Sequence, residues 1–157
     1  MLNEVKGSNP ILLPAMRGDC LLLAKTLREE DKVELTHALG LSPEQSLLYS
    51  YTASDNSYTA WLGDEIILMF GVGGIPGQYG SPWMLASDLL MSVKMTFIKQ
   101  CRPYVEALAD SYGYLENYVW AGNTGHIRWL KWLGFHICDP EPYGINGEPF
   151  HRFFMKR

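Results

Sequence analysis

The segment from residue 120 to residue 135 constrains the fold of this chain more than any other part of the sequence. An apolar, aromatic run ends at Trp120, Asn123 precedes a stretch with apolar residues at helical spacing, and Gly134 closes that stretch. Asparagine is favoured at a helix N-cap and glycine just after the last helical turn, because backbone groups at both ends of a helix lack partners within it. The segment therefore predicts the end of a strand, a helix over residues 124–133 and an abrupt exit at the glycine.

The rest of the sequence predicts a regular succession of strands and helices. Ser42 to Gln45 has the hydroxyl, proline and glutamine of a capping box, which marks a helix start. Gly63-Asp64 separates two apolar runs and predicts a hairpin. Asp19 is expected to cap the first of two short helices within residues 19–39, and Pro103 to kink one long helix. The expected strands cover residues 10–14, 58–62, 65–72, 83–86, 114–120, 135–138 and 150–155, and the later helices cover 43–53, 88–112 and 124–133.

Glycines are concentrated between the second strand of this hairpin and the next strand, over residues 71–80. The run lacks the Lys-Ser/Thr ending of a phosphate-binding loop, and it does not open a helix. We therefore expect a flexible connection. If this connection borders a binding site for a substrate or partner, Gln78 and Tyr79 are the candidate contacts. Trp132, at the edge of the apolar face of the 124–133 helix, is a further candidate partner contact, because aromatic side chains are frequent anchors in interfaces.

Length and composition narrow the class of protein. With 157 residues and 47% hydrophobic residues, we expect one domain over residues 1–157. A formal net charge of −4 disfavours direct nucleic-acid binding, which depends on neutralising phosphates. Three widely spaced cysteines give neither a disulfide framework nor a zinc motif, so no metal site is expected. No run approaches the ~18 apolar residues of a membrane span, so we expect a soluble protein made in the cytoplasm.

The 120–135 segment resembles the fourth helix of the Gcn5-related N-acetyltransferase (GNAT) fold, in which Asn, Ala-Ile, Tyr and Gly-Phe recur at fixed spacing. The matching positions here are Asn123, Ile127, Gly134 and Phe135. His126 takes the place of the alanine, and Leu130 takes that of the tyrosine. The order of expected elements also matches. The resemblance implies an α/β fold with a mixed, largely antiparallel central sheet of six to seven strands flanked by about four helices.

A narrower resemblance involves residues 83–88 and 117–128, which look like the GNAT-like internal virion proteins of short-tailed coliphages. It implies a phage protein that is made in the host cytoplasm and then enters the virion. Its partners would be virion proteins of the portal, tail or internal core, and an oligomer is compatible with that role. The function implied is a part in assembly or genome ejection.

The same resemblance locates acetyl-CoA, in active members of the family, between two splayed strands, with its pyrophosphate on a glycine-containing loop that opens the long helix. Here that junction contains Leu85, Ser87 and Asp88, without glycine, glutamine or arginine. The Asp88 carboxylate would stabilise the helix N-terminus and repel a phosphate. We therefore expect no cofactor; if acetyl-CoA is bound, the candidate contacts are Leu85, Ser87 and Asn123.

The catalytic tyrosine of the family, which protonates the leaving thiolate, corresponds to Leu130, and leucine cannot do this. Substitute acids would be His126 or Tyr143, which is expected in a loop, and Glu116 is the candidate base. Our leading hypothesis is accordingly a catalytically degenerate virion component. Two alternatives remain open: an active acetyl-CoA-dependent N-acetyltransferase acting on a host or phage amine, and a small protein that binds a bacterial target.

Overall fold

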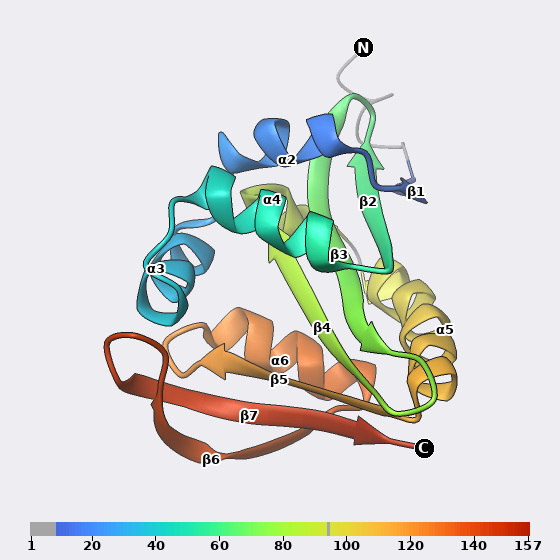
Figure 1. Cartoon of the computed structure of the whole chain (residues 1–157). Helices are drawn as coiled ribbons and strands as arrows, with labels where there is room; N and C mark the ends of the chain where they lie inside the picture. The colour runs from blue at the N-terminus through green and yellow to red at the C-terminus, as the bar shows by residue number, and fades with distance from the viewer. Residues whose placement is uncertain (1–8, 94) are drawn as a thin grey trace.

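A twisted seven-stranded sheet forms the centre of the computed structural model, which describes residues 9–93 and 95–157 (Figure 1). The strands are β1 (Ile11–Pro14), β2 (Asn56–Leu62), β3 (Glu65–Ile75), β4 (Tyr79–Ala86), β5 (Tyr114–Trp120), β6 (His136–Tyr143) and β7 (Glu148–Lys156). Their order in the sheet is β1-β2-β3-β4-β5-β7-β6. Every neighbouring pair is antiparallel except β4 and β5, which are parallel. The predicted mixed, largely antiparallel sheet is therefore confirmed.

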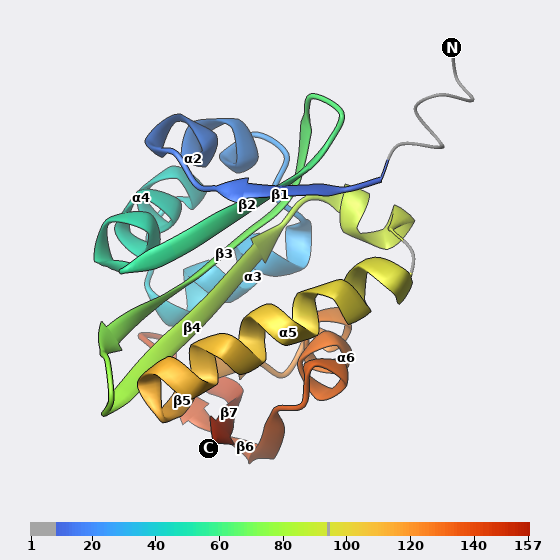
Figure 2. The ribbon, with the colours of Figure 1, turned by 90° about the vertical axis from the view of Figure 1, so that its right-hand side faces the viewer.

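Helices cover both faces of this sheet (Figure 2). The described residues form five α-helices and one short 3-10 helix, one more α-helix than the approximate number expected. They are α2 (Arg17–Ala24), α3 (Glu29–Ala38), α4 (Pro43–Ala53), η1 (Asp88–Ser92), α5 (Met95–Tyr112) and α6 (Thr124–Leu133). Helices α5 and α6 lie on one face, and α2 and α4 pack together on the other. Within the described residues, no helix combines the length and apolar character needed to cross a membrane.

The core divides into two clusters because both faces of the sheet are covered. One cluster joins α5 and α6 to the sheet through side chains such as Phe97, Trp129 and Phe153. The other joins α2, α3 and α4 to the opposite face and includes Leu23 and Leu47, each fully buried. Strand β3 serves both clusters, which explains its nearly continuous apolar sequence.

Several local predictions are confirmed by the hydrogen bonds at the element ends. Gln45 donates its backbone N–H to the Ser42 hydroxyl at 3.2 Å, and the Ser42 N–H donates to the Gln45 side chain at 3.1 Å, which completes the capping box. Helix α6 spans the predicted residues and ends at Gly134, whose φ of 102° lies in the left-handed region that favours glycine.

Asp19 does not precede a helix as expected. It lies in the first turn of α2, where its carboxylate accepts the Met16 N–H at 2.9 Å and the Thr59 hydroxyl at 2.8 Å. The side chain thus stabilises the helix start from inside the helix while tying it to β2.

The prediction of a flexible glycine-rich connection is wrong. Strands β3 and β4 continue through this region in antiparallel register up to the pair Ile75–Tyr79, so it forms a long hairpin. Its glycines allow close packing: a Cβ on Gly73 would collide with the carbonyl oxygen of Ala53 at the end of α4, and one on Gly80 would lie 2.8 Å from the Tyr112 ring. Glycine in a strand can mark such an approach of another backbone.

The expected single helix over residues 88–112 is also wrong at its start. Ser87 caps the 3-10 helix η1, Val93 has extended backbone angles, and α5 begins only at Met95. Residues 1–8 and 94, which fall within the predicted domain and helix, lie outside the described residues. Pro103 lies inside α5 and the helix ends before Gly113, as predicted. Strands β6 and β7 are longer than expected, and Tyr143 is the last residue of β6 and not a loop residue.

Candidate functional site

The candidate site lies where the two parallel strands diverge. Among the described residues, the register between β4 and β5 comprises one pair, Gly80 and Leu115, near the beginning of each strand. From there the strands separate toward their carboxyl ends, as Figure 1 shows. Backbone groups along a gap of this kind need partners from elsewhere.

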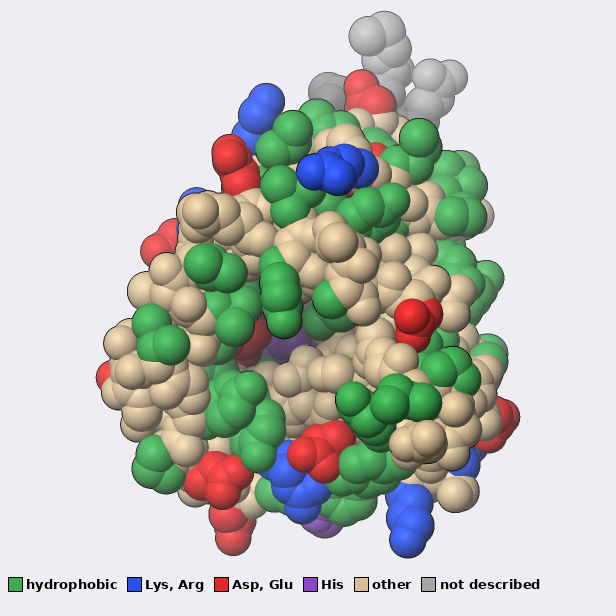
Figure 3. Space-filling view, in the orientation of Figure 1, with side chains coloured by type: hydrophobic (Ala, Val, Ile, Leu, Met, Phe, Trp, Pro, Cys, Tyr) green, Lys and Arg blue, Asp and Glu red, His purple; other side chains and the backbone are tan. Residues whose placement is uncertain are grey.

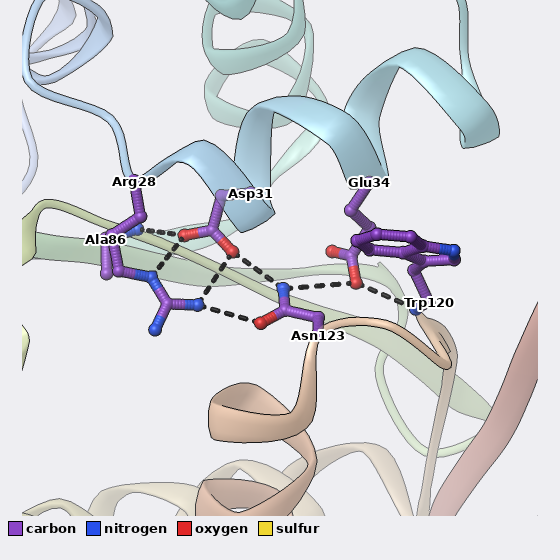
Figure 4. Close-up of polar contacts among 6 residues, drawn as sticks. All are labelled: Arg28, Asp31, Glu34, Ala86, Trp120 and Asn123. Carbon is purple, nitrogen blue, oxygen red and sulfur yellow. Dashed lines mark hydrogen bonds and ion pairs between the residues drawn. The ribbon is translucent and has the colours of Figure 1, made fainter.

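Helix α3 supplies those partners with two carboxylates one helical turn apart. Asp31 accepts the backbone N–H of Ala86, the last residue of β4, at 2.9 Å. Glu34 accepts the backbone N–H of Trp120, the last residue of β5, at 2.8 Å (Figure 4). Residues three apart share one face of a helix, so a single face of α3 bridges the open ends of both strands.

Arg28 and Asn123 complete a buried polar network around these carboxylates (Figure 4). The Arg28 guanidinium donates to both oxygens of Asp31, at 3.2 and 3.4 Å, and to the Asn123 side-chain oxygen at 2.8 Å. The Asn123 amide in turn donates to Asp31 at 2.9 Å and to Glu34 at 3.4 Å. All four residues are buried, and the network joins α3 to the end of β4 and the start of α6.

Burial shifts the proton affinities in this region. The pKa of Glu34 rises to about 8, first because the carboxylate is removed from water and second because Asp31 is close, although the Trp120 N–H and Asn123 oppose the shift. Burial lowers the pKa of His126 to about 4, with Asp31 opposing and Arg28 reinforcing that change. Near neutral pH, Glu34 therefore holds a proton and the His126 imidazole is uncharged.

A cleft of about 440 Å³ opens above this network, between α3, α4, β4 and the β6–β7 hairpin. Figure 3 shows it as a hollow in the middle of one face, with acidic and histidine atoms visible at its floor. Glu34 and His126 line it, and its wall includes four tyrosines, Tyr49, Tyr79, Tyr118 and Tyr143. The rings of Tyr118 and Tyr143 stack at 3.9 Å between centroids. The cleft combines a polar floor with an aromatic wall.

A second cavity lies on the other side of the sheet, toward α5 and α6. Its volume is only about 50 Å³, and its lining is almost entirely apolar, with Cys101, Trp129 and Leu130 among its residues. His126 lines this cavity as well as the open cleft. The imidazole therefore lies between the small apolar cavity and the larger cleft.

The structure brings four of the sequence-predicted residues to the open cleft: Leu85, Tyr79, His126 and Tyr143. Asn123 lies beneath it at the N-cap position of α6, but its side chain makes no capping bond and serves the buried network instead. The expectation that Asn123 caps the helix through its side chain is therefore wrong, since Arg28 and the carboxylates compete for that amide.

The other predicted residues lie elsewhere. Glu116 accepts bonds from Arg152 at 3.3 Å and from the Tyr114 hydroxyl, and it does not line the cleft. The Ser87 hydroxyl is buried and donates to the Ile66 carbonyl at 2.7 Å. Gln78 is exposed in the turn between β3 and β4, and Trp132 is 42% exposed on α6. The structure thus does not assemble Glu116, His126 and Tyr143 into one site.

Comparison with solved structures identifies the architecture. A GNAT-family acetyltransferase from Streptococcus pneumoniae aligns over 94% of this chain and 99% of its own, with a TM-score of 0.59 and 13% identity. The acetyltransferase AAC(6')-Ib in complex with ribostamycin and coenzyme A aligns over 95% and 94%, with a TM-score of 0.65 and 19% identity. An IAA acetyltransferase from Bacillus cereus aligns over 95% and 100%, with a TM-score of 0.63 and 14% identity. The chain has the GNAT fold.

Sequence comparison gives a different kind of relative. A family model described as bacteriophage T7 probable scaffold protein Gp13 matches residues 64–139. The probable scaffold protein gp13 of Escherichia phage T7 is 42% identical over 72 residues, which are 42% of this chain and 49% of that protein. The match spans about half the length of this curated relative. The matched region includes Asn123 and His126, whereas the three charged residues of the network on and before α3 lie outside it.

The sequence does not single out Arg28, Asp31 or Glu34, because charged residues on a short helix are usually exposed. They belong to a run in which charged residues are frequent, from Arg28 to Glu34. Helix α3 lacks a clear apolar face, and the residues that it buries include Asp31 and Glu34.

Proposed function

We propose that this chain is a catalytically degenerate GNAT-fold protein that acts by binding other proteins during phage particle assembly. The observation that carries the proposal is the closure of the β4–β5 gap by α3. In an active enzyme of this fold, the resemblance implies that acetyl-CoA lies between these strands. Here the terminal N–H groups of both strands are bonded to Asp31 and Glu34.

The remaining cofactor contacts are also unsuited to acetyl-CoA. A five-residue 3-10 helix stands between β4 and α5, so the long helix does not begin at the phosphate junction. The groove around that junction is lined by three carboxylates and two lysines, a mixed charge that does not favour a pyrophosphate. The apolar cavity behind the sheet is about 50 Å³ in volume, too small for a pantetheine arm. Leu130, in the place of the catalytic tyrosine, is buried beside it.

The assembly role is supported by the partial likeness to the probable scaffold protein of phage T7. A finer role as an internal virion component linked to genome ejection is part of the same proposal. Its partners are virion proteins of the portal, tail or internal core. The exposed surface offers aromatic contacts at Tyr79 and Trp132 for such a partner.

Acetyl-CoA binding tests the loss of catalysis. A ligand at about 100 times its dissociation constant adds about 2.7 kcal/mol to stability, or roughly 5 to 10 °C in melting temperature for a chain of this size. We expect no shift at millimolar acetyl-CoA in differential scanning fluorimetry. A concentration-dependent rise of several degrees would contradict the proposal and favour an N-acetyltransferase that acts on a host or phage amine, an alternative that the open cleft with His126 and Tyr143 favours.

Particle composition tests the assembly role separately. Mass spectrometry of purified particles, and of assembly intermediates isolated from infected cells, is expected to detect the chain in at least one of the two. Its absence from both, with recovery of a host protein in a pull-down, would instead favour the hypothesis of a protein that binds a bacterial target.

A further inference from the structure

Three side chains that bind metals in other proteins meet below the open cleft. Asp31 and Glu34 come from α3, and His126 comes from the first turn of α6. Each offers one donor atom, and these three atoms all lie within 4.8 Å of one another. The exposed fractions are 1% for Asp31, 8% for Glu34 and 5% for His126, so the group is almost entirely removed from bulk water.

Two of these residues have unused donor capacity. The Nδ1 atom of His126 is buried and has no hydrogen-bond partner among the described residues. Buried polar atoms nearly always have a partner, so an imidazole nitrogen of this kind needs an explanation. Glu34 uses its Oε1 atom for Trp120 and Asn123, while no bond to its Oε2 atom occurs in the described part of the chain.

The charges around the group leave room for a cation. Arg28 pairs with Asp31 at 3.2 Å and compensates that carboxylate. Within residues 9–93 and 95–157, neither lysine nor arginine forms an ion pair with Glu34. Burying a second carboxylate next to the first is unfavourable unless a positive charge or a proton accompanies it. A bound cation would take the place of such a proton.

We propose that Asp31, Glu34 and His126 bind one divalent first-row transition-metal ion, with Zn²⁺ as the ion to test first. A neutral imidazole with two carboxylates is a nitrogen–oxygen donor set that suits Zn²⁺ and its neighbours, whereas Ca²⁺ and Mg²⁺ prefer oxygen ligands alone. The open cleft gives water access to the remaining coordination position.

Such an ion would lock α3 against α6 across the open ends of β4 and β5. Asp31 would enter the coordination sphere through one carboxylate oxygen, and its hydrogen bonds from Arg28 and the Ala86 N–H would orient the carboxylate. Asn123, which donates to both carboxylates, would orient them from outside the sphere. This inference is independent of the proposed assembly function.

The test is calorimetric titration of Zn²⁺ into the full chain after metal removal with EDTA and exchange into chelator-free buffer. We expect one Zn²⁺ per chain, and affinity reduced by roughly tenfold or more in Glu34→Gln and in His126→Gln. Glu34→Gln retains an acceptor for the Trp120 N–H, so it is the milder change. Ca²⁺ in excess is expected to leave Zn²⁺ binding unchanged.

Two matched variants identify adventitious binding. His136 is an exposed histidine, and Cys138 is a partly exposed thiol two residues away. His136→Gln and Cys138→Ser are expected to bind Zn²⁺ as the unmodified chain does. Loss of binding in either variant, unchanged binding in both ligand variants, or no binding by the unmodified chain would overturn the proposal.

Cobalt spectroscopy covers the case in which a ligand variant does not fold. Co²⁺ bound by this group would show visible d–d bands without the near-ultraviolet thiolate charge-transfer band. A thiolate band in the unmodified chain would place the ion on a cysteine and refute the assignment.

Discussion

Arg28 is the residue on which the candidate site depends most. Its guanidinium touches the Asp31 carboxylate and the Asn123 amide oxygen, and the side chain is almost completely buried. Removing one partner of a buried pair leaves the other charge without compensation, which costs far more than losing an exposed pair.

We predict that Arg28→Met lowers the free energy of unfolding by about 3 to 5 kcal/mol. Arg128→Met is the control, because Arg128 is exposed on α6 and its replacement is expected to change stability by about 0.5 kcal/mol or less. Urea unfolding followed by tryptophan fluorescence measures both. Equal losses in the two variants would contradict a stabilising role for the network.

The raised pKa of Glu34 predicts that the stability of the protein depends on pH. Its pKa is about 8 when folded and about 4.5 in an unfolded chain, so the folded state retains a proton that the unfolded state releases. The associated stabilisation is complete below pH 4.5 and is lost as the pH rises through about 8. In EDTA, Glu34→Gln is therefore expected to lose less stability than the unmodified chain between about pH 5 and pH 9. Parallel urea midpoints across that interval would argue against the raised pKa.

Asn123 illustrates how far single residues are predictable from sequence. Its place at the start of a helix was predicted, because cap preference is a local property. Its bonding was not, since the competing partners Arg28 and Asp31 are far away in the sequence, and only the tertiary fold brings them together. His126 is equally far in sequence from Asp31 and Glu34 on α3, so their proximity was not predicted either.

At the scale of elements, the long β3–β4 hairpin is held against its neighbours by glycines. Gly73 lies where the end of α4 approaches β3, so that no side chain fits between the two backbones. The sequence pattern alone indicated a loop here, because glycine also marks flexible connections. What distinguishes the two cases is the neighbour that packs against the strand, and this neighbour comes from an earlier helix.

We predict that Gly73→Ala destabilises the protein by about 1 to 3 kcal/mol, because the new methyl group overlaps backbone atoms of Ala53 that cannot move independently. Gly18→Ala is the matched control. It lies in α2 with nothing within 4 Å of the added Cβ, and alanine is expected to stabilise the helix there by about 0.5 to 1 kcal/mol. Thermal unfolding of both variants measures the contrast, and similar shifts would refute the packing explanation.

Elements with local signals were predicted well. The capping box at Ser42, the turn at Gly63-Asp64 and the exit at Gly134 all depend on neighbouring residues. The break between η1 and α5 was not predicted, since the apolar spacing continues through it without proline or glycine. An antiparallel bridge between Leu27 and Ser87 precedes this region at the end of β4.

At the scale of the whole molecule, the architecture was predicted from the resemblance of residues 120–135 to the fourth GNAT helix, and the expected order of strands and helices agreed with it. Function is less accessible from the fold, since one fold supports many activities. The feature of this chain that bears most on function lies between the diverging strands β4 and β5. There, side chains of α3 accept the last backbone N–H group of each strand. The pattern of apolar residues in the sequence does not predict that side chains of α3 bind these strand ends.

The parallel pairing of β4 and β5 divides the sheet into two antiparallel groups of strands, β1 to β4 and β5 with β7 and β6. Within each group, antiparallel ladders of backbone bonds hold neighbouring strands together, with an irregularity in the β2–β3 pair and another in the β6–β7 pair. Between the two groups of strands, side chains make many of the contacts. The Arg28 network lies on one face of the sheet, and the core around α5 and α6 lies on the other. We therefore expect partial unfolding to begin at the boundary between β4 and β5, so that the two groups of strands behave as two cooperative units. Helix α3 would hold these two units together in the native state.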